Sequence, residues 1–220
     1  MLSLSVPYND FKVECQDILI SFSLPLRGDR HQFGVGAHRV AREGSVIALH
    51  DAWNRFCKNL ILRSTYHQFT TRSGQVLRPT VGRNQTEALQ FLNANLSAIC
   101  SKSFGEPTWF IPAATIDAAS VLNVPNRSII AASIGVSTIH STVSPSAGVQ
   151  ANASPPKEVQ SVRNYIAHRG KSAAARVTPL MSKYGASNIL QLLDSPVAGG
   201  IRLFESWVFD LLDMADFATR

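Results

Sequence analysis

The chain has 220 residues, of which 45% are hydrophobic and 16% charged, and its formal net charge is +6. This composition is typical of a folded globular protein and excludes a largely disordered one. No apolar run approaches the roughly 18 residues that a membrane span needs, and the N-terminus lacks the basic region and cleavage site of a signal peptide. We therefore expect a soluble cytoplasmic protein with no membrane partner.

The three cysteines, Cys15, Cys57 and Cys100, are far apart and lack the close pairing that zinc and redox motifs require. Carboxylate pairs and histidine clusters at metal-ligand spacing are also missing from the sequence. The sequence therefore predicts buried free thiols, no metal site and no other cofactor.

The first 40 residues differ in character from the rest of the chain. Residues 18–22 form an apolar run that resembles a strand, and glycines follow it at positions 28, 34 and 36. We expect residues 1–40 to form a short β-like N-terminal extension, outside the main domain.

From residue 41 onward the apolar residues recur mostly at helical spacing. The strongest helix is predicted over 45–64, with an inward stripe of Val46, Leu49, Trp53, Phe56 and Leu60. Further helices are predicted over 84–100, 113–122, 127–134, 155–169, near 189 and over 201–217, the last with Ile201, Phe204, Val208, Leu211 and Ala215 inward. Residues 137–154 are rich in Ser, Ala, Val and Pro without either period, which predicts a flexible loop. The sum is an all-α helical bundle over 41–220.

The predicted helix over 155–169 carries the residues with the clearest chemical potential. Its apolar stripe consists of Val159, Val162 and Ile166. Asn164 and His168 lie on a different side of the helix, with Arg163 at the edge of that side. The long stem of Arg163 could bring its guanidinium towards the same groove as His168. One helix would then present a cation and a titratable imidazole to one phosphate.

The segment Arg163-Asn164-Tyr165-Ile166-Ala167-His168 resembles the signature of the HEPN superfamily of small all-helical ribonucleases. In that signature an Arg, commonly followed by a polar residue, precedes a His by a short stretch of helix. The resemblance is sharpest over residues 154–170 and extends more loosely over about 45–217, leaving 1–40 outside. Gly170 stands where one branch of the superfamily carries a Tyr that accepts a nucleotide, so that activity is not implied.

The resemblance implies a helical bundle of HEPN type that acts as a metal-independent endoribonuclease and a homodimer, with the two Arg163–His168 helices flanking one cleft. It also implies a toxin or an antiphage defence effector, controlled by a separate antitoxin, sensor or other regulatory protein. The residue chemistry agrees, since an imidazole can take a proton from a ribose 2′-hydroxyl or donate one to the leaving 5′-oxygen. A guanidinium can hold the phosphoryl oxygens, and Asn164 could orient His168 or bind a phosphate.

The basic residues concentrate in 55–83 and 151–185. If the two segments share a face, they form an RNA-binding surface that contacts phosphates through Arg55, Lys58, Arg63 and Lys171. The alternative is that these charges are scattered over the surface and simply solvated. His50 lies near the apolar side of its helix, so we expect a packed histidine rather than a catalyst. Tyr165 falls away from the polar stripe, and packing is expected for it rather than base stacking.

Two other functions remain open. A non-catalytic adaptor could keep the HEPN fold for dimerisation or partner binding. An RNA-binding module could use the basic segments alone, and its RNA binding would survive the substitution His168→Ala without any cleavage.

Overall fold

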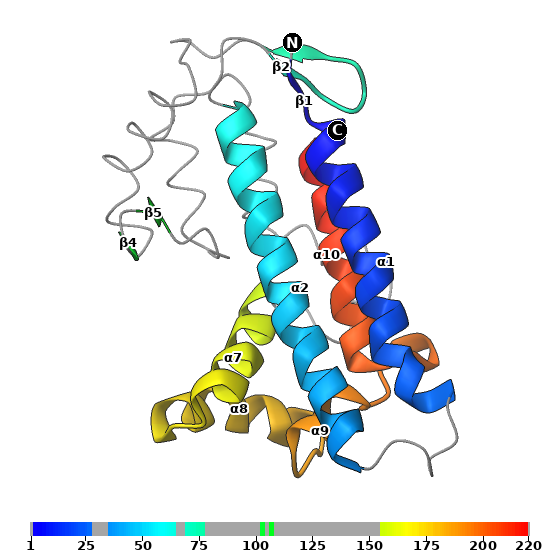
Figure 1. Cartoon of the computed structure of the whole chain (residues 1–220), viewed down its shortest axis with the longest axis vertical. Helices are drawn as coiled ribbons and strands as arrows, with labels where there is room; N and C mark the ends of the chain where they lie inside the picture. Colours follow the sequence, from blue (N-terminus) through cyan, green and yellow to red (C-terminus); the bar gives the residue numbers. More distant parts are fainter. Residues whose placement is uncertain are drawn as a thin grey trace. The chain divides into compact units, whose positions relative to one another are not determined.

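The computed structural model describes residues 2–27, 35–64, 69–77, 102–103, 106–107 and 155–219. These ranges are mostly helical and contain α1 (Ser5–Arg27), α2 (Val35–Ser64), α7 (Pro155–His168), α8 (Lys171–Lys183), α9 (Ile189–Leu193) and α10 (Leu203–Thr219) (Figure 1). None of these helices is long and apolar enough to cross a membrane. The predicted all-α class is confirmed for the described residues. The helices predicted over 84–100, 113–122 and 127–134 and the loop predicted over 137–154 lie outside them.

The strands are two residues long and form two small sheets. In the first sheet, β1 (Leu2–Ser3) pairs in parallel with β2 (Phe69–Thr70), which pairs antiparallel with β3 (Val76–Leu77). Gly74 in the β2–β3 turn has a φ of 87°, a conformation that favours glycine. In the second sheet, β4 (Lys102–Ser103) pairs antiparallel with β5 (Glu106–Pro107).

The predicted β-like extension over residues 1–40 is wrong, because residues 18–22 lie within α1. The buried side chains along α1 include Phe11, Cys15, Ile18 and Phe22. Their steps of four, three and four residues place them on one helical face, so burying that face stabilises a helix and not a strand. A short apolar run is ambiguous by itself, which explains the error. The boundary predicted near residue 40 falls inside α2.

The chain groups into two compact units, to both of which α1, α2 and α10 contribute. The first comprises residues 1–11, 53–154 and 212–220, and the second comprises 12–52 and 155–211. In the first unit, Phe11 meets the rings of Trp53 and Phe56 at centroid distances of 5.6 and 5.2 Å. The backbone N–H of Leu4 donates to the carbonyl of Thr70 at 2.9 Å and extends the β1–β2 pairing.

The core of the second unit includes a stacked pair of rings, Phe22 and Phe204, with centroids 4.2 Å apart. The guanidinium carbons of Arg42 and Arg202 lie 4.9 and 4.7 Å from the centroid of the Phe22 ring. Arg42 is only 5% exposed and forms an ion pair with Asp194. Arg42 thus makes a cation–π contact with Phe22 of α1 and an ion pair with Asp194 at the end of α9. Together these contacts hold α1, α2 and the end of α9 in one cluster.

The predicted inward stripes of the two long helices agree well with the structure. All five predicted residues of 45–64 are buried, although α2 begins ten residues earlier, at Val35. Of the five predicted inward residues over 201–217, four are buried, and the half-buried exception, Ile201, precedes the first residue of α10.

The helix α7 forms where the sequence predicts it. Pro155 and Pro156 occupy its first turn, where a missing N–H costs no hydrogen bond, and it ends at His168, before Gly170. A two-residue connection joins it to α8, and the two helices pack against each other (Figure 1). Glu158 of α7 contacts two other helices. Its carboxylate accepts a hydrogen bond from Trp207 Nε1 of α10 at 2.8 Å and lies 3.4 Å from Lys183 Nζ of α8.

Candidate functional site

Arg163 and Asn164 lie on the middle turns of α7, and both are half-buried. Arg163 Nη1 donates to Asn164 Oδ1 at 3.2 Å. Arg163 Nε is buried and finds no acceptor among the described residues. Asn164 therefore contacts the guanidinium of the predicted site, and its expected role at His168 stays a prediction.

His168 is exposed and is the last residue of α7. Five residues separate it from Arg163, which places the two side chains about 140° apart around the helix axis. Within the described residues, no hydrogen bond or ion pair joins them. One chain thus presents both groups on the predicted helix but does not bring them into direct contact.

His50 on α2 is 6% exposed, which confirms that it is a packed histidine. Its Nδ1 lies 3.0 Å from Asp51 Oδ1. Burial lowers the pKa of His50, the hydrogen bond to Asp51 opposes this, and the positive charge of Arg163 lowers the pKa further. The sequence did not reveal that the charge of Arg163 acts on His50, because the two residues are distant in the chain.

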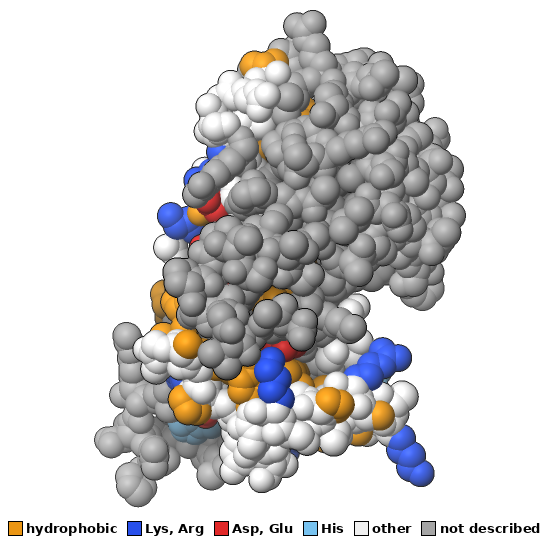
Figure 2. Space-filling view, turned by 180° about the vertical axis from the view of Figure 1, so that it is seen from behind, with side chains coloured by type: hydrophobic (Ala, Val, Ile, Leu, Met, Phe, Trp, Pro, Cys, Tyr) orange, Lys and Arg blue, Asp and Glu red, His pale blue; other side chains and the backbone are white. Residues whose placement is uncertain are grey.

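The four predicted RNA-binding residues divide between the two units. Arg55 is exposed and Arg63 is half-buried, and both belong to the first unit. Arg63 Nη1 donates to the Ser3 carbonyl at 3.4 Å. Lys171 is exposed and belongs to the second unit. The side chain of Lys58 is not among those that the structure describes. On the face drawn in Figure 2, Lys and Arg side chains stand out from the described surface as separate projections. A common phosphate-binding track through these residues remains a prediction.

The connection between α7 and α8 concentrates positive charge next to His168. It contains Arg169 and is followed by Lys171, both exposed. The N-cap of α8 is Gly170, which supplies no side-chain acceptor, and the first turn of α8 holds no acidic residue. The positive end of the α8 dipole is therefore available to an anion beside the imidazole.

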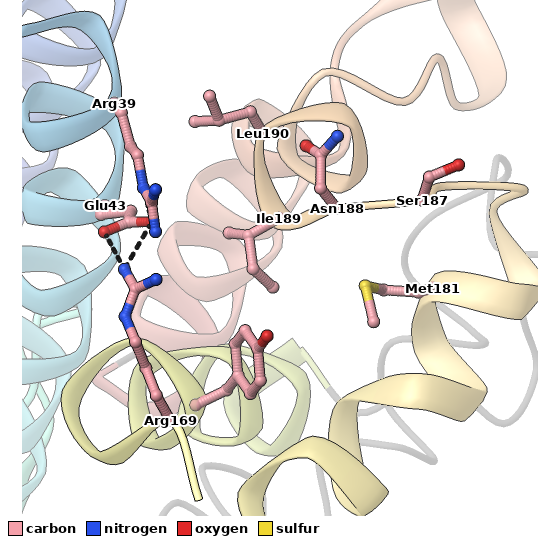
Figure 3. Close-up of a pocket in the computed structure, with 9 residues that line it drawn as sticks. Arg39, Glu43, Arg169, Met181, Ser187, Asn188, Ile189 and Leu190 are labelled. Atoms are coloured by element: carbon pink, nitrogen blue, oxygen red, sulfur yellow. Dashed lines mark hydrogen bonds and ion pairs between the residues drawn. The ribbon is translucent and has the colours of Figure 1, made fainter. Parts of the chain in front are cut away.

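A cavity of about 260 Å³ in the second unit adjoins the C-terminal end of α7. One of its walls is an ionic cluster in which Arg39 and Arg169 both bind the carboxylate of Glu43 (Figure 3). Arg169 has a φ of 47°, in the left-handed region. This cluster was not predicted from the sequence, where only the i,i+4 spacing of Arg39 and Glu43 could have suggested a part of it.

Comparisons with known proteins do not assign the chain to a family. No protein-family model matches the sequence, and neither the curated proteins nor the solved structures yield a significant match. Within the described ranges, no group of three or more His, Cys, Asp or Glu side chains could hold a metal ion.

Proposed function

We propose that the chain is a metal-independent endoribonuclease of HEPN type in which Arg163 and His168 are catalytic. The observation that carries the proposal is the course of α7, which runs from Pro155 to an exposed His168 with the Arg163–Asn164 hydrogen bond on its middle turns. The positive charge around the α7–α8 connection supports the binding of an RNA phosphate at the same place.

In the proposed reaction the ribose 2′-oxygen attacks the adjacent phosphorus and the bond to the 5′-oxygen breaks. A base removes the 2′-hydroxyl proton, and an acid returns a proton to the leaving 5′-oxygen, so the products are a 2′,3′-cyclic phosphate and a 5′-hydroxyl. His168 serves in this proton transfer because its exposed imidazole can reach a bound strand. Arg163 stabilises the negative charge on the phosphoryl oxygens, and Asn164 holds its guanidinium.

The proposed active form is a homodimer. Within one chain, Arg163 and His168 project to different sides of α7, whereas transesterification needs an acid, a base and a phosphate ligand around one phosphorus. Two-fold pairing through α7 doubles the set of groups without any new sequence. The toxin or antiphage setting, with a separate regulatory protein, belongs to this same proposal.

The test is RNA cleavage by the purified protein in excess EDTA, with chemical identification of the product ends. We expect His168→Ala to reduce the rate by at least about 100-fold without lowering the melting temperature, because the side chain is exposed. Arg163→Lys keeps the charge but loses the planar donor set, and it should also be defective. Arg176→Ala is the matched control, since it removes an exposed cation of α8 outside the proposed catalytic group.

The alternatives predict different results in the same assays. If the wild-type chain forms dimers but neither binds nor cleaves RNA, the adaptor function is favoured. If it binds RNA with an affinity that falls as salt rises, yet neither it nor His168→Ala cleaves, the RNA-binding module is favoured. Cleavage by His168→Ala at the wild-type rate would refute the assignment of His168.

A further inference from the structure

The charged wall of the cavity holds two guanidinium groups and one carboxylate. Arg39 Nε lies 2.8 Å from Glu43 Oε1, and Arg169 Nη2 lies 2.9 Å from Glu43 Oε2. The Glu43 side chain is 14% exposed, whereas those of Arg39 and Arg169 are 47% and 50% exposed. The wall thus carries one net positive charge, and the exposed parts of both guanidiniums can donate to a further anion. Such paired guanidiniums match the oxygens of a phosphate.

Apart from this wall, the lining combines apolar side chains with two polar ones, Ser187 and Asn188. The lining also includes Tyr165 from α7, Met181 from α8, and Ile189 and Leu190 from α9. Figure 3 shows Met181 across the cavity from the Arg39–Glu43–Arg169 wall, with Ile189 and Leu190 between them. Aromatic, thioether and aliphatic side chains form a surface on which a flat heterocycle can stack. The volume of about 260 Å³ lies just below the range of about 300–1,000 Å³ for drug-sized ligands, so it suits one nucleobase.

The cavity adjoins the proposed catalytic helix. Tyr165 precedes His168 by three residues on α7, so the two are neighbours on the helix surface. Arg169 follows His168 directly in the connection to α8. Arg169 takes the left-handed conformation although the next residue is Gly170, which could adopt it without strain. In this conformation the Arg169 guanidinium binds Glu43 and forms part of the cavity wall.

We propose that this cavity binds one nucleotide unit of a single-stranded RNA. The base stacks against Tyr165 and the apolar lining, and the adjoining phosphate binds Arg39 and Arg169, which brings the ribose-phosphate backbone to His168. The assignment of an RNA strand rests on the proposed ribonuclease function. Tyr165 accordingly contacts the base, although its place away from the polar stripe of the helix had favoured packing.

The experiment titrates the full-length protein with 5′-AMP and with 5′-UMP and follows binding by NMR. Adenosine, uridine and inorganic phosphate are titrated in parallel, because only a site with both parts binds the nucleotide more tightly than either part. We expect the nucleotides to bind at least about tenfold more tightly than phosphate alone, because the base stacks on the lining. Binding should also shift the methyl signals of Met181, Ile189 and Leu190.

Two variants and one control locate the site. Arg39→Gln removes one guanidinium and should weaken nucleotide binding by about three- to tenfold, since the group is half exposed. Ser187→Trp places a large side chain at an exposed lining position and should block the cavity without disturbing the core. Arg176→Gln removes the same charge from α8 outside the cavity and should bind nucleotides as the wild type does.

Equal affinity for phosphate and nucleotide would overturn the proposal, and so would unchanged nucleotide binding by both Arg39→Gln and Ser187→Trp. Its failure is separable from that of the ribonuclease function, because His168→Ala should lose cleavage and keep nucleotide binding. A chain that binds nucleotides in this cavity but cuts no RNA would support the site and refute the nuclease. A chain that cuts RNA without binding nucleotides there would do the reverse.

Discussion

Removal of the Glu158 carboxylate tests how α7 is held in the second unit. In Glu158→Ala the indole N–H of Trp207, a residue that is 1% exposed, loses the acceptor that now lies 2.8 Å away. An unsatisfied buried donor costs about 1–3 kcal/mol. The ion pair with Lys183 adds less than about 1 kcal/mol, because that side chain is 40% exposed and the atoms are 3.4 Å apart. We expect a loss of about 2–3 kcal/mol in the free energy of unfolding.

For a chain of this size the loss corresponds to a fall of about 4–12 °C in melting temperature. Thermal and urea unfolding, followed by circular dichroism, measure it. Glu158→Gln keeps an acceptor for the indole and should cost about 1 kcal/mol, whereas Lys183→Met keeps the Trp207 hydrogen bond and should cost less still. A double-mutant cycle of Glu158→Ala with Trp207→Phe should give a coupling energy of about 1–2 kcal/mol. Additive effects of the two substitutions would refute the reasoning.

Three further predictions follow from buried groups. The pKa of His50 is lower in the folded chain than its ordinary value of 6.5. As the pH falls below 6.5, the unfolded chain therefore takes up the proton first, and the free energy of unfolding should decrease. Urea unfolding of His50→Gln should show a weaker pH dependence than that of the parent. Burial raises the pKa of Cys15 to about 12, so brief alkylation followed by peptide mapping should leave this thiol unmodified until the chain unfolds. Asp194→Ala removes the carboxylate that pairs with Arg42, a residue that is only 5% exposed. Because Asp194 itself is partly exposed, we expect the free energy of unfolding in urea to fall by only about 2–3 kcal/mol.

Each of these three predictions has a clear contrary result. Equal pH profiles for the parent and His50→Gln would remove His50 from the pH dependence. Rapid alkylation of Cys15 in the native chain would contradict its burial. For the ion pair, a urea-unfolding curve of Asp194→Ala that matches the parent would show that solvent satisfies Arg42 as well as the carboxylate does.

Elements with local signals could be predicted from the sequence alone. The stripe of Val46, Leu49, Trp53, Phe56 and Leu60 was predictable because helical spacing is a property of neighbouring residues. The bounds of α7 were predictable for the same reason, since prolines suit a first helical turn and Gly170 follows the last turn. The exposure of His168 agreed with its place on the polar side of that helix.

Tertiary packing decided the rest. Residues 18–22 suit a strand by composition, and they are helical because α1 buries Phe11, Cys15, Ile18 and Phe22 along one face. Likewise, no local pattern relates Glu43 to Arg169, or Arg163 to His50. The first is an ion pair and the second an electrostatic effect; both act between segments far apart in the chain, and their geometry depends on how whole helices pack. The ionic wall of the cavity and the surroundings of Arg163 could therefore be known only from the folded chain.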